Sequence, residues 1–74
     1  MATAAELKER IERAIPGAQA EVESPDDVHF SARVVSPAFI GKSRLQQHRM
    51  VYDVFAGGEL GGAIHALSLK TEVP

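Results

Sequence analysis

The sequence predicts an α+β sandwich in which two amphipathic helices pack on one face of a three-stranded mixed β-sheet. Two capping boxes indicate the helices, because each opens a segment whose apolar residues recur at three- and four-residue steps. Three further segments indicate strands, because apolar and polar residues alternate along them. The expected order is helix, strand, strand, short 3-10 turn, helix and strand, and the apolar helix faces need a sheet face to pack on.

The length and composition are those of one small globular domain, which we expect to span residues 1–74. A core of this size supplies roughly 3–5 kcal/mol of stability. The net charge of −2 gives no overall attraction to nucleic acid, and the chain has no cysteine for a disulfide or a thiolate metal site. The sequence shows no signal peptide and no long apolar run, so we expect a soluble cytoplasmic protein without membrane contact.

The first helix is expected over about residues 3–14, because Thr3 and Glu6 form the capping box T-x-x-E. In such a box the threonine hydroxyl accepts a hydrogen bond from a backbone N–H of the first turn. Pro16 and Gly17 end the helix, since both residues are typical of the positions that follow one. The expected apolar face consists of Ala4, Leu7, Ile11 and Ala14.

Two strands, at about residues 18–23 and 28–35, are expected to form an antiparallel hairpin. The linker between them, Ser-Pro-Asp-Asp, is composed of residues that favour tight turns. Because the linker is so short, the two strands must run in opposite directions. Their apolar faces consist of Ala20 and Val22 in the first strand and Val28, Phe30, Ala32 and Val34 in the second.

A short 3-10 turn and the second helix follow the hairpin. Pro37 fits the first position of a short helical turn, and Gly41 permits a backbone conformation that other residues resist. Ser43 and Gln46 form a second capping box, S-x-x-Q, which predicts a helix over about residues 44–56. The expected apolar face of this helix consists of Leu45, His48, Val51, Tyr52 and Phe55.

The third strand is expected over about residues 63–71. It should lie parallel to the second strand, because a helical crossover connects the two. His65, Leu67 and Leu69 share one face of this strand. The residues that we expect to be largely buried are Phe30, Val34, Leu45, Val51, Tyr52, Phe55, Leu67 and Leu69.

Two stretches of the chain also resemble a known family. VVSPAFIGKSRLQQHRMVY and, further along, IHALSLKTEVP are similar to the two sequence motifs of the BolA family. The resemblance is colinear over residues 28–74, and the two motifs together are more specific than either alone. It implies a class II KH-like arrangement of the helices and strands described above.

Three histidines are the candidate metal-binding residues. His65 falls on the apolar face of the third strand, so one interpretation is a core histidine that is hydrogen-bonded. The BolA resemblance implies another, in which His65 is a ligand of a 2Fe-2S cluster shared with a monothiol glutaredoxin and glutathione. His48 matches the His-Arg motif of the family, but we interpret it as a residue that packs between helix and sheet.

The family usually places a second cluster ligand, cysteine or histidine, in the hairpin loop. Here the loop is short, Asp26 stands near the position at which some relatives have the cysteine, and His29 is the available nitrogen donor. His29 and His65 should approach the same edge of the sheet, because parallel neighbouring strands start at one edge. In the alternation along the strands, however, the two side chains fall on opposite faces of the sheet, which argues against their binding one metal as a tight chelate.

Lys42, Arg44 and Arg49, together with Lys70, form a candidate basic surface. Ordinary solvated charges are the simpler interpretation, and the alternative is DNA binding, which is described for some BolA-like proteins. The G-x-x-G loop of KH domains is missing, because Gly41 stands alone. The sequence has no nucleophile–base pair, no paired carboxylates and no phosphate-binding loop, so we expect no enzymatic activity.

The resemblance therefore leads us to expect an adaptor that carries no cofactor when alone and binds a monothiol glutaredoxin. In the complex His65, with His29, would help to ligate a bridging 2Fe-2S cluster, in iron–sulfur trafficking or in iron and redox regulation. The alternative function is a DNA-binding transcriptional regulator that uses the basic turn and helix at residues 41–49. A third interpretation is an interaction module that binds neither.

Overall fold

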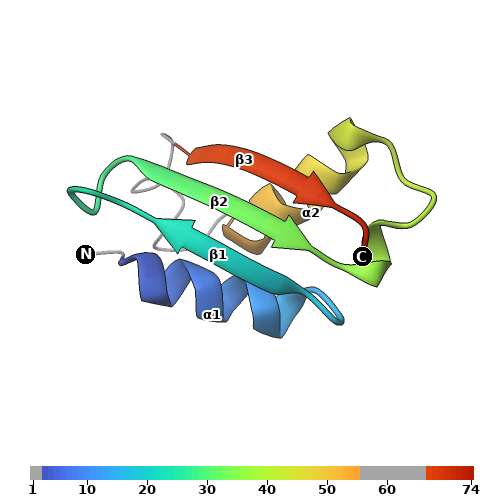
Figure 1. Ribbon diagram of the computed structural model, residues 1–74, viewed down its shortest axis with the longest axis horizontal. Coiled ribbons are helices and arrows are strands. Elements are labelled where there is room, and N and C mark those ends of the chain that lie inside the picture. Colours follow the sequence, from blue (N-terminus) through green and yellow to red (C-terminus); the bar gives the residue numbers. More distant parts are fainter. Residues whose placement is uncertain (1–2, 56–66) are drawn as a thin grey trace.

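The computed structural model describes residues 3–55 and 67–74 of the chain. The elements within these residues are α1 (Ala4–Ala14), β1 (Gln19–Glu23), β2 (Phe30–Val35), the 3-10 helix η1 (Pro37–Phe39), α2 (Arg44–Phe55) and β3 (Leu67–Glu72). Figure 1 shows the sheet with both α-helices behind it; α1 packs against β1 and α2 against β3. The predicted α+β sandwich and its element order are therefore confirmed.

The strands form one mixed sheet in the order β1-β2-β3. β1 and β2 are antiparallel, with Gln19 opposite Val35, as the short hairpin linker predicted. β2 and β3 are parallel, with Phe30 opposite Leu67 at one end and Val35 opposite Glu72 at the other. β2 and β3 consequently begin at the same end of the sheet, and the hairpin loop lies at this end.

Both predicted capping boxes are present at the helix starts. The Glu6 N–H donates to the Thr3 hydroxyl oxygen at 3.2 Å. At the second helix the box is reciprocal, because the Gln46 N–H donates to Ser43 Oγ at 3.1 Å and Gln46 Oε1 accepts from the Ser43 N–H at 2.8 Å. Neither described helix combines the length and the apolar character that a membrane crossing requires.

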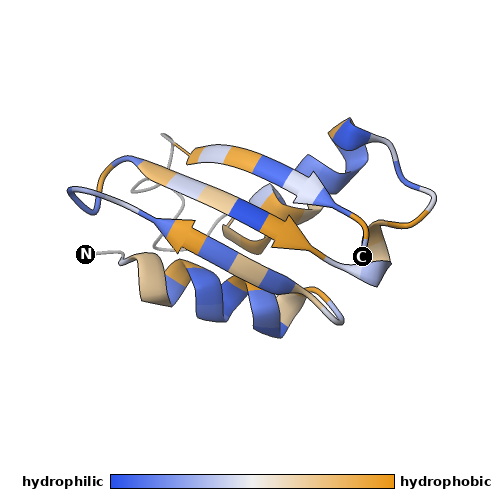
Figure 2. Ribbon diagram, in the orientation of Figure 1, coloured by the Kyte–Doolittle hydropathy of each residue, from blue (hydrophilic) through white to orange (hydrophobic). Residues whose placement is uncertain are grey.

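The core lies between the helices and the sheet face that they cover. Figure 2 shows the alternation of apolar and polar residues along the strands that produces this covered face. Phe30 and Val34 of β2 are buried, as are Val51 and Phe55 of α2 and Leu67 of β3, which confirms five of the predicted core residues. The other buried apolar residues are Leu7, Ile11, Ile15, Ala20, Ala32 and Phe39.

The face of α2 that packs on the sheet differs from the predicted one. The predictions for Leu45 and Tyr52 are wrong, because these side chains are 61% and 44% exposed. Apolar residues cover a wide arc of this helix, and only part of such an arc can contact the sheet. Val51 and Phe55, supported by Val54, take the sheet side, which turns Leu45 toward solvent. Tyr52 lies at the rim of this contact, where its hydroxyl donates to the Leu67 carbonyl.

The strand boundaries also differ from the predicted ones. β2 begins at Phe30 rather than Val28, because Val28 belongs to the preceding turn and is 48% exposed. Leu69 is only partly buried, since β3 is an edge strand with one neighbour in the sheet. β3 ends at Glu72, one residue later than expected, and residues 63–66 of the predicted strand lie outside the described residues.

Gln47 connects α2 to the rest of the domain. Its Nε2 donates to the Lys42 carbonyl at 2.9 Å and to the Phe39 carbonyl at 3.2 Å. Its Oε1 accepts from the hydroxyl of Thr71 in β3 at 2.7 Å. One amide therefore ties the turn before α2, the helix itself and the edge strand together.

Candidate functional site

The loop between β1 and β2 has a defined conformation that side-chain hydrogen bonds maintain. Ser24 Oγ accepts from the Asp27 N–H at 2.9 Å and donates to the His29 carbonyl at 2.6 Å. Asp26 Oδ1 accepts from the N–H groups of Val28 and His29, at 3.0 and 2.9 Å. Asp27 adopts φ of 59°, a left-handed conformation that aspartate tolerates better than most residues. The sequence Ser-Pro-Asp-Asp thus forms a closed turn directly before His29.

The imidazole of His29 is presented at the surface beside Asp26. Its Nδ1 lies 2.8 Å from Asp26 Oδ2, while the side chain is 70% exposed. The backbone N–H of His29, then its ring and then the N–H of Val28 hold the pKa of Asp26 well below its usual range. Metal-binding histidines commonly have their second ring nitrogen bonded to a carboxylate in this way. Of the predicted ligands, His29 thus has a carboxylate beside one of its ring nitrogens, and its role as a ligand stays a prediction.

His65, the other predicted ligand, lies outside the described residues. The structure does describe the strand that follows it, and Leu67 of that strand pairs with Phe30, directly after His29. Tyr52 Oη donates to the Leu67 carbonyl at 3.1 Å, so α2 holds the start of β3 at the end of the sheet that carries the hairpin loop. Residues 3–55 and 67–74 contain no group of three His, Cys, Asp or Glu residues that could hold a metal by themselves.

His48 and part of the basic surface lie beside the other end of β3. His48 is half-buried, and it lines a shallow pocket with Arg44, Leu69, Lys70 and Thr71. The packing role that we expected for His48 from the sequence stays a prediction.

The predicted nucleic-acid residues are only partly brought together. Arg44 shares the shallow pocket with Lys70, whereas Lys42 and Arg49 are exposed but do not line it. These positions leave DNA binding as a prediction from the sequence.

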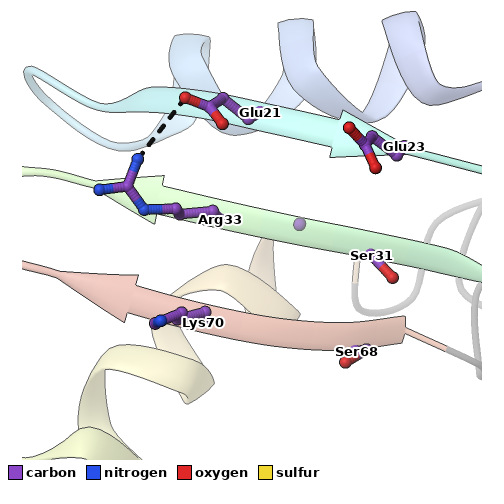
Figure 3. A pocket seen from close by; sticks show the side chains of 7 residues that line it. Glu21, Glu23, Ser31, Arg33, Ser68 and Lys70 are labelled. Atoms are coloured by element: carbon purple, nitrogen blue, oxygen red, sulfur yellow. Dashed lines mark ion pairs between the residues drawn. The ribbon is translucent and has the colours of Figure 1, made fainter.

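The sheet face that the helices leave uncovered is polar. Figure 3 shows Arg33 of β2 between Glu21 and Glu23 of β1 and Lys70 of β3. Arg33 forms an ion pair with Glu21 at 3.5 Å and a second one with Glu72 of β3. Glu72 raises the pKa of Arg33, and Arg33 in turn lowers the pKa of Glu72. This face offers complementary charges that neutralise one another rather than a reactive group.

The pairing of Asp26 with His29 is the feature of the site that our sequence analysis missed. We assigned Asp26 to turn chemistry and to the position of a cysteine in some relatives, but not to the imidazole. The available signal was the spacing, because an aspartate three residues before a histidine in a tight turn can reach both its backbone and its ring.

The chain is similar to proteins of known sequence and structure. A family model described as BolA-like protein matches residues 7–74. SufE-like protein 1, chloroplastic/mitochondrial, from Arabidopsis thaliana is 44% identical over 48 residues, which are 65% of this chain and 13% of that protein. BolA-like protein 1 from Homo sapiens is 46% identical over 48 residues, which are 65% of this chain and 34% of that protein. The matched segments are thus a minor part of the length of these two curated relatives.

The fold is also found among solved structures. A bolA protein homologue from Coxiella burnetii has a TM-score of 0.83 and 37% sequence identity to this chain. The similarity covers 100% of this chain and 94% of the other one, so it includes both helices and the whole sheet.

Proposed function

The chain belongs to the BolA-like protein family, and from this premise we propose that it is an adaptor that binds a monothiol glutaredoxin and helps to ligate a 2Fe-2S cluster bridging the two proteins. Its proposed role is in iron–sulfur cluster trafficking or in iron and redox regulation. The observation that carries the proposal is the exposed imidazole of His29, which Asp26 holds at the end of the sheet where β3 begins.

The donor groups of the chain fit one part of such a site. An imidazole nitrogen replaces a thiolate in some 2Fe-2S centres, so His29 is a suitable ligand. The chain has no cysteine, and its described residues contain no self-sufficient group of metal ligands. In the proposal the thiolates therefore come from outside this chain, and the BolA resemblance implies the active-site cysteine of the glutaredoxin and glutathione as their source, so the proposed function needs a partner.

His65 is the second imidazole of the proposal. It stands two positions before Leu67 in the sequence, and Leu67 pairs with Phe30, the residue after His29. Two residues of extended chain span at most about 7 Å. We therefore propose that His65 and His29 serve the same cluster, with His65 as the main ligand because it matches the family motif.

Histidine ligation has a chemical consequence that an experiment can detect. A neutral imidazole carries less negative charge than a thiolate, so the cluster should have a higher reduction potential than one held by thiolates alone. Its visible absorption and circular dichroism should also differ from those of the cluster on glutaredoxin alone, because the ligands of the iron have changed.

The test mixes the protein with a cluster-loaded monothiol glutaredoxin and glutathione and records visible absorption and circular dichroism. We expect the wild-type protein to produce a new spectrum and the His65→Ala protein to lack it. Calorimetric titration with the apo glutaredoxin should show that His65→Ala retains the association. His29→Ala should reduce the new spectral signal by a smaller amount.

His48→Ala is the matched control, since it removes a histidine that lies between α2 and β3, and it should leave the new spectrum unchanged. An unchanged spectrum with His65→Ala would show that the ligand assignment is wrong. The lack of any complex between the wild-type protein and the glutaredoxin would contradict the proposed function itself.

A further inference from the structure

We propose that Asp26 is a positioning residue, which holds His29 in the tautomer that carries its proton on Nδ1 and so makes Nε2 the metal-binding nitrogen. The inference rests on the proposed function for the identity of the metal centre. The tautomer itself is a property of the chain alone, and it can be measured without any partner.

One proton lies between the two side chains. An ionised carboxylate can only accept hydrogen bonds, and an aspartate is ionised at neutral pH. His29 Nδ1 and Asp26 Oδ2 are 2.8 Å apart, which is a hydrogen-bonding distance, so Nδ1 must be the donor. A neutral imidazole has one N–H group. With the proton on Nδ1, Nε2 has a free electron pair, which is the form that binds a metal.

Hydrogen bonds hold the Asp26–His29 pair in a fixed arrangement. Asp26 uses Oδ1 for the N–H groups of Val28 and His29, so its carboxylate cannot rotate without losing two hydrogen bonds. Ser24 Oγ holds the carbonyl of His29 at 2.6 Å. The backbone N–H, the backbone carbonyl and the ring Nδ1 of His29 are therefore all fixed, although the side chain is 70% exposed. An exposed histidine that is constrained at three points is prepared for a directional contact.

The stability of the loop alone does not explain the pair. The turn needs only Asp26 Oδ1, and an asparagine would supply an equivalent oxygen. The bond from Oδ2 to the ring is additional, and an exposed contact of this kind contributes little to folding even when the histidine is charged. A carboxylate behind the ring does, however, make the opposite nitrogen a better metal ligand. The structure thus assigns the second carboxylate oxygen to the imidazole rather than to the turn.

The test compares Asp26→Asn with the wild-type protein. The asparagine oxygen can retain both backbone hydrogen bonds of the turn, but its NH₂ group is a donor and pairs with an unprotonated Nδ1. The substitution should therefore move the proton of His29 to Nε2. Asp27→Asn is the matched control, because it makes the same charge change in the same loop and asparagine also tolerates the φ of 59° there.

The readout is a long-range ¹H–¹⁵N correlation spectrum of the histidine rings, recorded on the protein alone at about pH 8, above the ordinary histidine pKa of about 6.5. The wild-type protein and Asp27→Asn should show a protonated Nδ1 and an unprotonated Nε2 for His29, and Asp26→Asn should show the reverse. Backbone amide shifts should confirm that the turn persists. A wild-type ring with the proton on Nε2, or a ring that Asp26→Asn does not alter, would overturn the positioning role.

The second measurement uses the complex with cluster-loaded glutaredoxin. Asp26→Asn should change the visible circular dichroism in the same direction as His29→Ala, and Asp27→Asn should not. An Asp26→Asn complex with the wild-type spectrum would overturn the metal-binding part of the inference while leaving the adaptor function in place. If the wild-type protein forms no complex, the proposed function fails, and the tautomer measurement still decides the role of Asp26.

Discussion

At the scale of single residues, Leu67 and Leu45 are the same side chain in opposite environments. Leu67 begins β3 under α2 and is 9% exposed, whereas Leu45 lies on the solvent side of α2 and is 61% exposed. Truncating each of them to alanine removes the same atoms. The difference between the two variants therefore reports chiefly on burial, with a smaller contribution from the helix and strand propensities of alanine.

Leu67→Ala should lower the free energy of unfolding by about 2–5 kcal/mol, because it removes buried methyl groups and leaves a cavity. This loss approaches the roughly 3–5 kcal/mol that the core of so small a domain supplies. Leu45→Ala should change the free energy of unfolding by less than about 0.5 kcal/mol. Urea unfolding followed by circular dichroism measures both, and equal losses would contradict the observed orientation of α2.

At the scale of elements, Glu12 connects α1 to β1. Its Oε2 accepts from the Ala20 N–H at 3.0 Å and from Lys8 Nζ at 2.9 Å. The hydrogen bond from Ala20 first, and then Lys8, lower the pKa of Glu12 below its ordinary value. The helix and the edge strand are thus held together best when this carboxylate is ionised.

The link between α1 and β1 should make stability depend on pH. A carboxyl group whose pKa is lower in the folded chain stabilises the fold above its unfolded value, about 4.3 for glutamate, and loses this effect as the pH falls through its folded value. The melting temperature of Glu12→Gln should therefore decrease less steeply than that of the wild-type protein between about pH 5 and 3.

Thermal unfolding at a series of pH values provides the comparison. Glu9→Gln is the control, since Glu9 belongs to the same helix and its ion pair with Arg13 is exposed. Glu9→Gln should keep the wild-type slope. The same slope for Glu12→Gln and the wild-type protein would show that the contact with Ala20 does not contribute to acid sensitivity.

At the scale of the whole molecule, the helices cover one face of the sheet and charged side chains cover the other. Arg33 in the central strand pairs with Glu21 of β1 (Figure 3) and with Glu72 of β3, so one guanidinium links all three strands. These pairs are accessible to solvent, and salt therefore screens them.

Arg33→Met should lower the melting temperature slightly at low ionic strength, and the difference from the wild-type protein should fade at about 1 M salt, where screening acts within about 3 Å. Thermal unfolding at the two salt concentrations checks this, with Lys42→Met in the exposed turn as the control. A difference that salt does not change would mean that Arg33 acts through the packing of its aliphatic stem instead.

The elements and their order could be predicted from the sequence because the signals that form them are local. A capping box such as Ser43 with Gln46 acts between residues three positions apart, and strand alternation acts between neighbours. The antiparallel hairpin and the parallel pairing of β3 followed from the lengths of the connections. His29 could be chosen as a candidate from its residue type and its place in the loop, and His65 stays a prediction.

The tertiary structure alone decided which apolar residues are covered and which polar side chains meet. Leu45 is as hydrophobic as the residues that α2 buries, but the apolar arc of that helix is wider than its contact with the sheet. Arg33 meets Glu72, which lies far along the chain, because β2 and β3 pair side by side. Both outcomes depend on how segments are oriented in space, and local sequence preferences do not specify that orientation.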